Sequence, residues 1–136
     1  MAIVLDASIT LSWCFPDEQT SASLAVLDRL KAGDFALVPA FWSLEVLNSL
    51  LVGERRGRIS PDQSHAFLTS LQALNPTLDH GTLEQAVGPL QKLCRDHHLT
   101  PYDALYVELA MRMHCPLAFL DKTQIDAARL LGIECL

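Results

Sequence analysis

Two aspartates each follow a short apolar segment that has the composition of a buried strand. Asp6 follows residues 2–5, and Asp121 follows residues 116–120. In an open parallel sheet, ligands bind outside the carboxyl ends of the strands, so we expect both carboxylates to project into one crevice from neighbouring strands. The alternative is that each aspartate only caps the next helix or forms a turn.

A third acid, Glu45, lies in a helical stretch, residues 41–51, in which nearly every neighbour is apolar. A buried unpaired carboxylate is too costly to leave uncompensated, so an inward-facing Glu45 requires a cation or a proton. The alternative places Glu45 on a narrow solvent-facing stripe together with Asn48, one turn further on. If Glu45 lies with Asp6 and Asp121, a bound metal is the simplest compensation.

Asp103 is the fourth candidate acid. Residues 100–103 (Thr-Pro-Tyr-Asp) have the pattern of a capping box, in which Asp103 helps a helix to start. The rest of that helix is almost wholly apolar, and Glu108 and Arg112, spaced i,i+4, are expected to mark its one exposed stripe. Asp103 lies about 140° round the helix from Glu108, at ~100° per residue, so we expect it to face elsewhere.

Several carboxylates in one pocket repel one another, and their natural partner is a hard divalent cation with oxygen ligands. Mg²⁺ or Mn²⁺ held by these acids can activate a water molecule and offset the charge on a phosphate during in-line displacement. The whole chain has ten Lys and Arg against sixteen Asp and Glu, a net charge of −6. That balance argues against a protein that binds nucleic acid by bulk electrostatics alone.

Strands that alternate with helices along the whole chain must position these acids. Apolar runs predict the strands, and proline, glycine and N-cap residues bound the helices. The expected strands are residues 2–5, 35–38, 77–79, 116–120 and 133–135. The expected helices are residues 8–14, 17–31, 40–56, 60–74, 82–97, 100–113 and 125–131. The economical architecture is α/β, with a central parallel sheet of four to five short strands and helices on both faces.

The length of 136 residues predicts one domain, residues 1–136. Half of the residues are hydrophobic and 19% are charged, which excludes a disordered chain. No apolar run approaches the ~20 residues of a membrane helix, and the N-terminus lacks a signal-peptide pattern. We therefore expect a soluble, cytoplasmic protein with no membrane partner, whose four widely separated cysteines are reduced thiols.

Together these motifs resemble the PIN domain, and most closely the VapC-like toxins of prokaryotic toxin–antitoxin pairs. The similarity rests on residues 4–8 (Val-Leu-Asp-Ala-Ser), on Pro39 followed by Glu45 and Asn48, on residues 102–106 (Tyr-Asp-Ala-Leu-Tyr) and on Leu120-Asp121. It covers the whole chain. The resemblance implies that the metal-binding, catalytic acids are Asp6, Glu45, Asp103 and Asp121, with Ser8 and Asn48 as supporting polar groups.

The resemblance further implies a metal-dependent endoribonuclease that uses Mg²⁺ or Mn²⁺ and leaves 5′-phosphate and 3′-hydroxyl ends. It implies a cognate antitoxin protein, a homodimer, and a structured RNA substrate with an exposed loop, tRNA above all. One departure leaves the number of metal ions open. Many relatives have a further acid or Asn shortly after the fourth acid, whereas Lys122, Thr123 and Gln124 follow Asp121 here, and Asp126 lies far into the next helix.

Three arginines, Arg55, Arg56 and Arg58, cluster where a predicted helix ends. Cations complement the helix dipole at such a position, and little else in the chain is basic, so the three are also candidate RNA-binding residues.

Other functions fit the sequence less well. A phosphatase of the haloacid-dehalogenase type needs a second Asp two residues after the first, and position 8 here is serine. The serious alternative is a catalytically inactive PIN-like module that binds protein or RNA and whose acids are merely structural.

Overall fold

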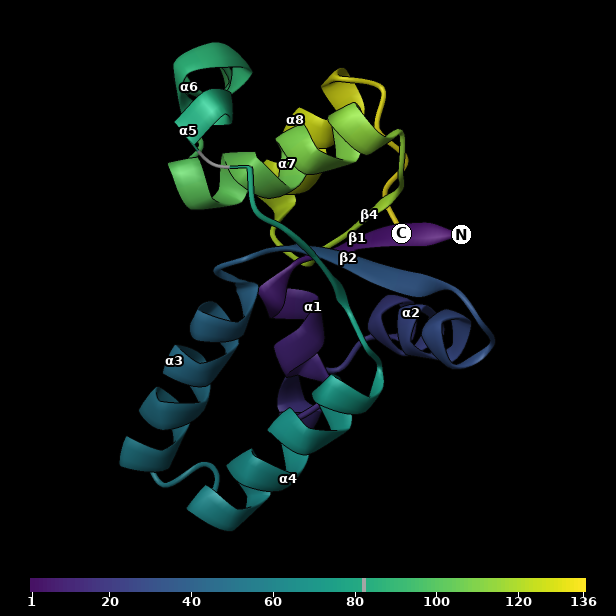
Figure 1. The fold of residues 1–136 in the computed structure, drawn as a ribbon. Coiled ribbons are helices and arrows are strands. Elements are labelled where there is room, and N and C mark those ends of the chain that lie inside the picture. The colour runs from purple at the N-terminus through teal and green to yellow at the C-terminus, as the bar shows by residue number, and fades with distance from the viewer. Residues whose placement is uncertain (82) are drawn as a thin grey trace.

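The computed structural model describes residues 1–81 and 83–136 and places a parallel sheet at the centre of the chain (Figure 1). Its strands are β1 (Ala2–Leu5), β2 (Phe35–Pro39), β3 (Thr77–Asp79) and β4 (Leu117–Ala118). They lie in the order β3-β2-β1-β4, and every pairing is parallel. The neighbours β1 and β4, in register at Leu5 and Ala118, therefore end at the same edge of the sheet.

Helices cover both faces of the sheet, as predicted, with α1 to α4 on one side and α5 to α8 on the other (Figure 1). Their bounds are α1 (Ala7–Ser12), α2 (Ser21–Lys31), α3 (Trp42–Arg55), α4 (Pro61–Ala73), α5 (Leu83–Gln85), α6 (Gln91–His97), α7 (Pro101–Met113) and α8 (Lys122–Leu130). None of these helices is long and apolar enough to cross a bilayer.

The core lies where β1 meets α7. Ile3, Val4 and Leu5 are fully buried, which explains why β1 is an apolar run without polar alternation. Residues 104–110 of α7 are buried as well, and this helix contacts β1, β2 and β4. The four cysteines pack at the margin of this core and are free thiols.

Local chemistry shifts two of the predicted helices. The helix expected over residues 17–31 begins only at Ser21, because Thr20 and Ser23 form a capping box there, and Pro16–Glu18 forms a separate 3-10 turn. The helix expected over residues 82–97 is divided by a π-helical segment, Ala86–Leu90, that contains Pro89. Proline removes a backbone donor and clashes with the preceding turn, so a continuous helix was the wrong prediction. Residue 82 lies outside the described residues.

The C-terminal region also differs from expectation. Helix α8 begins at Lys122 rather than residue 125, because the Asp121 side chain caps it. The strand expected over residues 133–135 is reduced to a single parallel bridge between Cys135 and Leu117. Among the described residues the sheet therefore has four strands, the lower of the two numbers predicted.

Glu108 does not mark an exposed stripe, contrary to the prediction. Its i,i+4 pair with Arg112 forms, with Nε donating to Oε1 at 2.8 Å, but Glu108 is only 4% exposed. The same guanidinium donates two hydrogen bonds to Asp79 at the end of β3, at 2.8 and 3.1 Å. Arg112 thus compensates a buried carboxylate and ties the edge strand β3 to α7.

Replacing Arg112 by Met leaves the Glu108 carboxylate buried without its partner. We expect the free energy of unfolding, measured by urea denaturation, to fall by about 2 kcal/mol. The control is Lys92→Met, which breaks an exposed i,i+4 pair with Asp96 and should cost less than about 0.5 kcal/mol. Equal effects of the two substitutions would contradict this role of Arg112.

Candidate active site

Asp6 lies at the carboxyl end of β1 and is only 6% exposed. Its carboxylate caps α1 by accepting a hydrogen bond from the Ser8 backbone N–H at 3.2 Å. The Ser8 hydroxyl also donates to this carboxylate, and its oxygen accepts from the Leu120 N–H at 3.3 Å. Ser8 therefore joins Asp6 to the chain just before Asp121.

Asp121 follows β4 and caps α8, accepting a hydrogen bond from the Gln124 N–H at 3.2 Å. Unlike Asp6, it is exposed. The capping interpretation thus holds for both strand-ending aspartates, yet both also line one cavity. The two interpretations are compatible because a capping bond uses one carboxylate oxygen and leaves a second to face the cavity.

Glu45 is half-buried on α3 and lines the cavity. Its Oε1 accepts a hydrogen bond from the Tyr106 hydroxyl at 2.5 Å. Asn48, one turn on, is exposed and lies on the wall of the same cavity.

Asp103 reaches the cavity from the first turn of α7, where its backbone N–H donates to the Thr100 hydroxyl at 3.2 Å. The Thr100 half of the predicted capping box is therefore confirmed. Asp103 and Glu108 also face different surroundings, as predicted, since Glu108 lines another cavity.

The cavity has a volume of about 340 Å³ and lies at the carboxyl edge of the sheet. The four predicted acids and both predicted supporting groups are on its wall. Its lining residues are Asp6, Ala7, Ser8, Leu11, Glu45, Asn48, Ser49, Asp103, Asp121 and Gln124.

Burial and mutual repulsion disfavour the ionised acids. Burial raises the pKa of Asp6, and the charge of Asp103 raises it further, against the lowering effect of the Ser8 hydrogen bonds. Burial likewise raises the pKa of Glu45, and the charges of Asp6 and Asp103 add to this. The pKa of Asp103 is raised by burial and then by Asp121, while hydrogen bonding from Thr100 and Gln124 lowers it. The acids therefore interact with one another.

The chemistry of this donor set fits a hard divalent cation, because carboxylate oxygens are the ligands that Mg²⁺ and Mn²⁺ prefer. The four carboxylates are not yet close enough together to serve as the ligands of one metal ion. Within residues 1–81 and 83–136, no three His, Cys, Asp or Glu side chains are grouped closely enough to hold a metal as they stand. Binding would require the carboxylates to turn toward one another.

Sequence reasoning missed two residues of the site. Tyr106 was part of a recognised motif, but its apolar surroundings gave no sign that its hydroxyl bonds Glu45. In the sequence, Gln124 stands out only as one of the residues after Asp121 where many relatives have an acid or Asn. In the structure, Gln124 is 3% exposed, lines the cavity and hydrogen-bonds to Asp103. Its spacing from Asp121 at the start of a helix could have indicated only the capping bond that its backbone N–H donates to Asp121.

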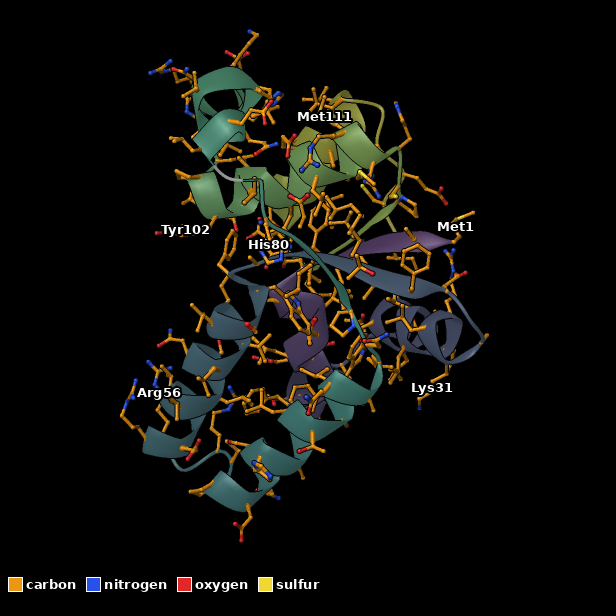
Figure 2. The ribbon with its side chains drawn as sticks, in the orientation of Figure 1. Met1, Lys31, Arg56, His80, Tyr102 and Met111 are labelled. Carbon is orange, nitrogen blue, oxygen red and sulfur yellow. The ribbon has the colours of Figure 1, made fainter. Side chains whose placement is uncertain are left out.

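The structure separates the three arginines into two groups. Arg58 stacks over the Phe15 ring at 4.2 Å and donates to Asp17 at 2.9 Å, so its charge is already engaged. Arg55 and Arg56 are exposed, and among the described residues neither takes part in an ion pair. Arg56 projects outward from the C-terminal end of α3 (Figure 2).

Comparisons with known proteins point in one direction. Residues 3–130 match the family model described as the PIN domain. Ribonuclease VapC3 from Pyrobaculum aerophilum is 28% identical over 125 residues, which cover 90% of this chain and 91% of that protein. VapBC2 from Rickettsia felis, in a crystal structure bound to a DNA fragment from their promoter, matches with a TM-score of 0.66 at 14% identity, covering 100% of this chain and 98% of that one. FitAcB from Neisseria gonorrhoeae matches with a TM-score of 0.65 at 13% identity, covering 100% and 96%. At these identities the two structures show a shared fold.

Replacing Asp6 by Asn is expected to stabilise the metal-free protein at pH 7. The folded-state pKa of Asp6 is raised, so its ionised form opposes folding above that pKa, and this cost disappears as the pH falls below the unfolded-state value. Asn keeps the N-cap of α1. Urea unfolding in EDTA should show a higher free energy of unfolding for Asp6→Asn at pH 7, and this difference should shrink as the pH is lowered toward the unfolded-state pKa of Asp. Asp28→Asn, at an exposed position of α2, is the control. A destabilised variant, or a gain that does not change with pH, would contradict the prediction.

Proposed function

The chain belongs to the PIN domain family, and on this premise we propose that it is a metal-dependent endoribonuclease, the toxin of a VapBC-type toxin–antitoxin pair. One observation carries the proposal: four acids from separate segments of the chain line one cavity at the carboxyl edge of the sheet. A relative that covers most of the chain is named a ribonuclease, which supports the activity.

Asp6, Glu45, Asp103 and Asp121 would hold Mg²⁺ or Mn²⁺. The bound cation supplies an activated water and offsets the charge that develops on the phosphate. The chain's own groups supply the remainder. Ser8 orients Asp6, and the amides of Asn48 and Gln124 offer neutral donors on the cavity wall that suit a phosphate oxygen.

A cavity of about 340 Å³ suits an unpaired RNA backbone better than a duplex. Sequence-specific recognition of RNA uses mainly single-stranded loops and ends, whose bases and backbone are accessible. We therefore propose an unpaired RNA segment as the substrate, and the family resemblance extends this proposal to structured RNA with an exposed loop, such as tRNA.

The antitoxin would cover the outer face of α3. Leu44, Leu47 and Leu51 are exposed at helical spacing beside the cavity residues Glu45 and Asn48. Exposed apolar stripes of this kind mark interaction sites. A partner segment with apolar side chains on these leucines could place an Arg against the acids, since guanidinium pairs well with carboxylates. Structures of VapBC2 and FitAcB are similar to this chain, which supports a partner of that type. The family resemblance also leads us to propose a homodimer.

The second candidate function is an inactive PIN-like module that binds RNA or protein. It is favoured by the absence, within the described residues, of a ligand group already arranged for a metal. A module of this kind would bind RNA with or without metal and would cleave none.

Cleavage of a mixed RNA pool by the purified protein tests the proposal. We expect cleavage with Mg²⁺ or Mn²⁺, 5′-phosphate ends, and none with EDTA. Asp103→Asn should lower the rate at least about 100-fold, because even changes outside a metal's direct ligands cost 10–100-fold. Asp126→Asn is the control, an exposed acid on α8 outside the cavity wall. Cleavage that persists in EDTA would contradict the metal, and RNA binding without cleavage would favour the inactive module.

The arginines are tested separately by RNA binding in the Asp103→Asn background, where cleavage is suppressed. Neutralising Arg55 and Arg56 together should weaken binding and lower the slope of log Kd against log salt by about 1.4, if each contacts one phosphate. Arg58→Gln should instead lower stability, because it loses Asp17 and Phe15. Unchanged binding by the double variant would remove both arginines from the RNA-binding surface.

A further inference from the structure

Tyr106 occupies a position where its buried hydroxyl can act on the acidic cavity. It lies one turn after Asp103 on α7, so the two side chains share a helix face. The residue is only 1% exposed, yet its hydroxyl lies 2.5 Å from Glu45 Oε1. Burial raises the pKa of Tyr106, so the phenol keeps its proton and acts as the donor.

This one hydroxyl connects the elements that carry two of the four acids. The phenol belongs to α7, which carries Asp103, and it donates to Glu45 of α3. The hydroxyl of Tyr106 thus joins α7 to α3 beside the cavity.

Aromatic packing holds the ring in place. Phe41, next to the start of α3, packs edge-on against Tyr106 at a centroid distance of 5.8 Å and against Tyr102 at 5.5 Å. Figure 2 shows Tyr102 at the beginning of α7, beside α3. Tyr102 is 61% exposed, so the two tyrosines share a packing partner but only the hydroxyl of Tyr106 is directed to an acid.

Glu45 needs such a constraint more than the aspartates do. Asp6 and Asp121 are each fixed by capping a helix, whereas Glu45 has a longer side chain and like charges from Asp6 and Asp103 that push it away. A neutral donor on Oε1 restrains the carboxylate and leaves Oε2 available. A charged donor in its place would compete with a cation for the site.

We propose that Tyr106 is a positioning residue whose hydroxyl holds Glu45 in the orientation that lets it share a divalent cation with Asp6 and Asp103. This inference rests on the proposed function, because it assigns Glu45 to the metal site. The residue acts through Glu45 and does not itself touch the cation or the RNA.

The test compares Tyr106→Phe with Tyr102→Phe, a matched control that loses a hydroxyl from the same helix. Mn²⁺ binding is measured by titration calorimetry, and folding is checked by circular dichroism. We expect Tyr106→Phe to weaken Mn²⁺ binding about 10-fold, as is typical when a group that orients a metal ligand is lost, and Tyr102→Phe to leave it unchanged. In a Glu45→Gln background, Tyr106→Phe should have little further effect, because the hydroxyl acts through Glu45.

Equal Mn²⁺ affinities of the two Phe variants, including no binding by either, would overturn the proposal. A full Tyr106→Phe effect in the Glu45→Gln background would overturn it as well. The ribonuclease assay tests the proposed function independently of Tyr106. Wild-type protein that binds Mn²⁺ but cleaves no RNA would contradict the proposed function. The comparison of Mn²⁺ affinities would still decide the role of Tyr106.

Discussion

Like-charge repulsion among four carboxylates is the constraint on which the arrangement of the cavity depends. The acids differ in depth, from the buried Asp6 to the exposed Asp121, and burial raises the pKa of the deeper ones. No arginine or lysine lies on the described wall of the cavity. The hydrogen-bonding groups around the acids are neutral, and they are the hydroxyls of Ser8, Thr100 and Tyr106 and the amide groups of Gln124. Such groups orient carboxylates without cancelling their charge, which leaves the cavity suited to an added cation.

Helix α7 carries a cavity residue at its N-terminal end and a stabilising ion pair nearer its C-terminal end. Its first turns place Asp103 on the cavity wall and the buried Tyr106 against Glu45, while a later turn carries Glu108 and Arg112 on another face. The second pair compensates a buried charge and reaches Asp79 on the edge strand β3. Because the middle of the helix is packed on β1 and β2, its two ends are held in one rigid frame. A substitution that displaces one end of α7 would therefore also disturb the other end, because both are joined through the same packed core.

The outer surface of α3 adjoins the cavity and combines two kinds of side chain. The exposed leucines Leu44, Leu47 and Leu51 lie along the helix, and Arg55 and Arg56 lie at its end. Under the proposed function, the leucines would be covered by an antitoxin and the arginines would meet RNA. Both partners would then compete for neighbouring parts of one surface, which gives a physical route by which an antitoxin could exclude the substrate.

The sequence by itself determined the α/β class, the alternation of elements and the order of the four acids. Local rules suffice for these: the buried run at residues 2–5 identifies β1, and cap residues such as Thr100 set helix starts. Only the tertiary structure decided which side chains meet. The register of β1 with β4 brings Asp6 close to the chain before Asp121. The contact of Phe41, at the start of α3, with the first turns of α7 places the Tyr106 hydroxyl against Glu45. The same is true of Glu108, whose helical spacing indicated an exposed pair. Its burial comes with segments far away in the chain, and its partner Arg112 also bonds Asp79. Periodicity reports which face of a helix is apolar, whereas contacts between residues far apart in the chain depend on how the helices and strands pack, and no local pattern encodes that packing.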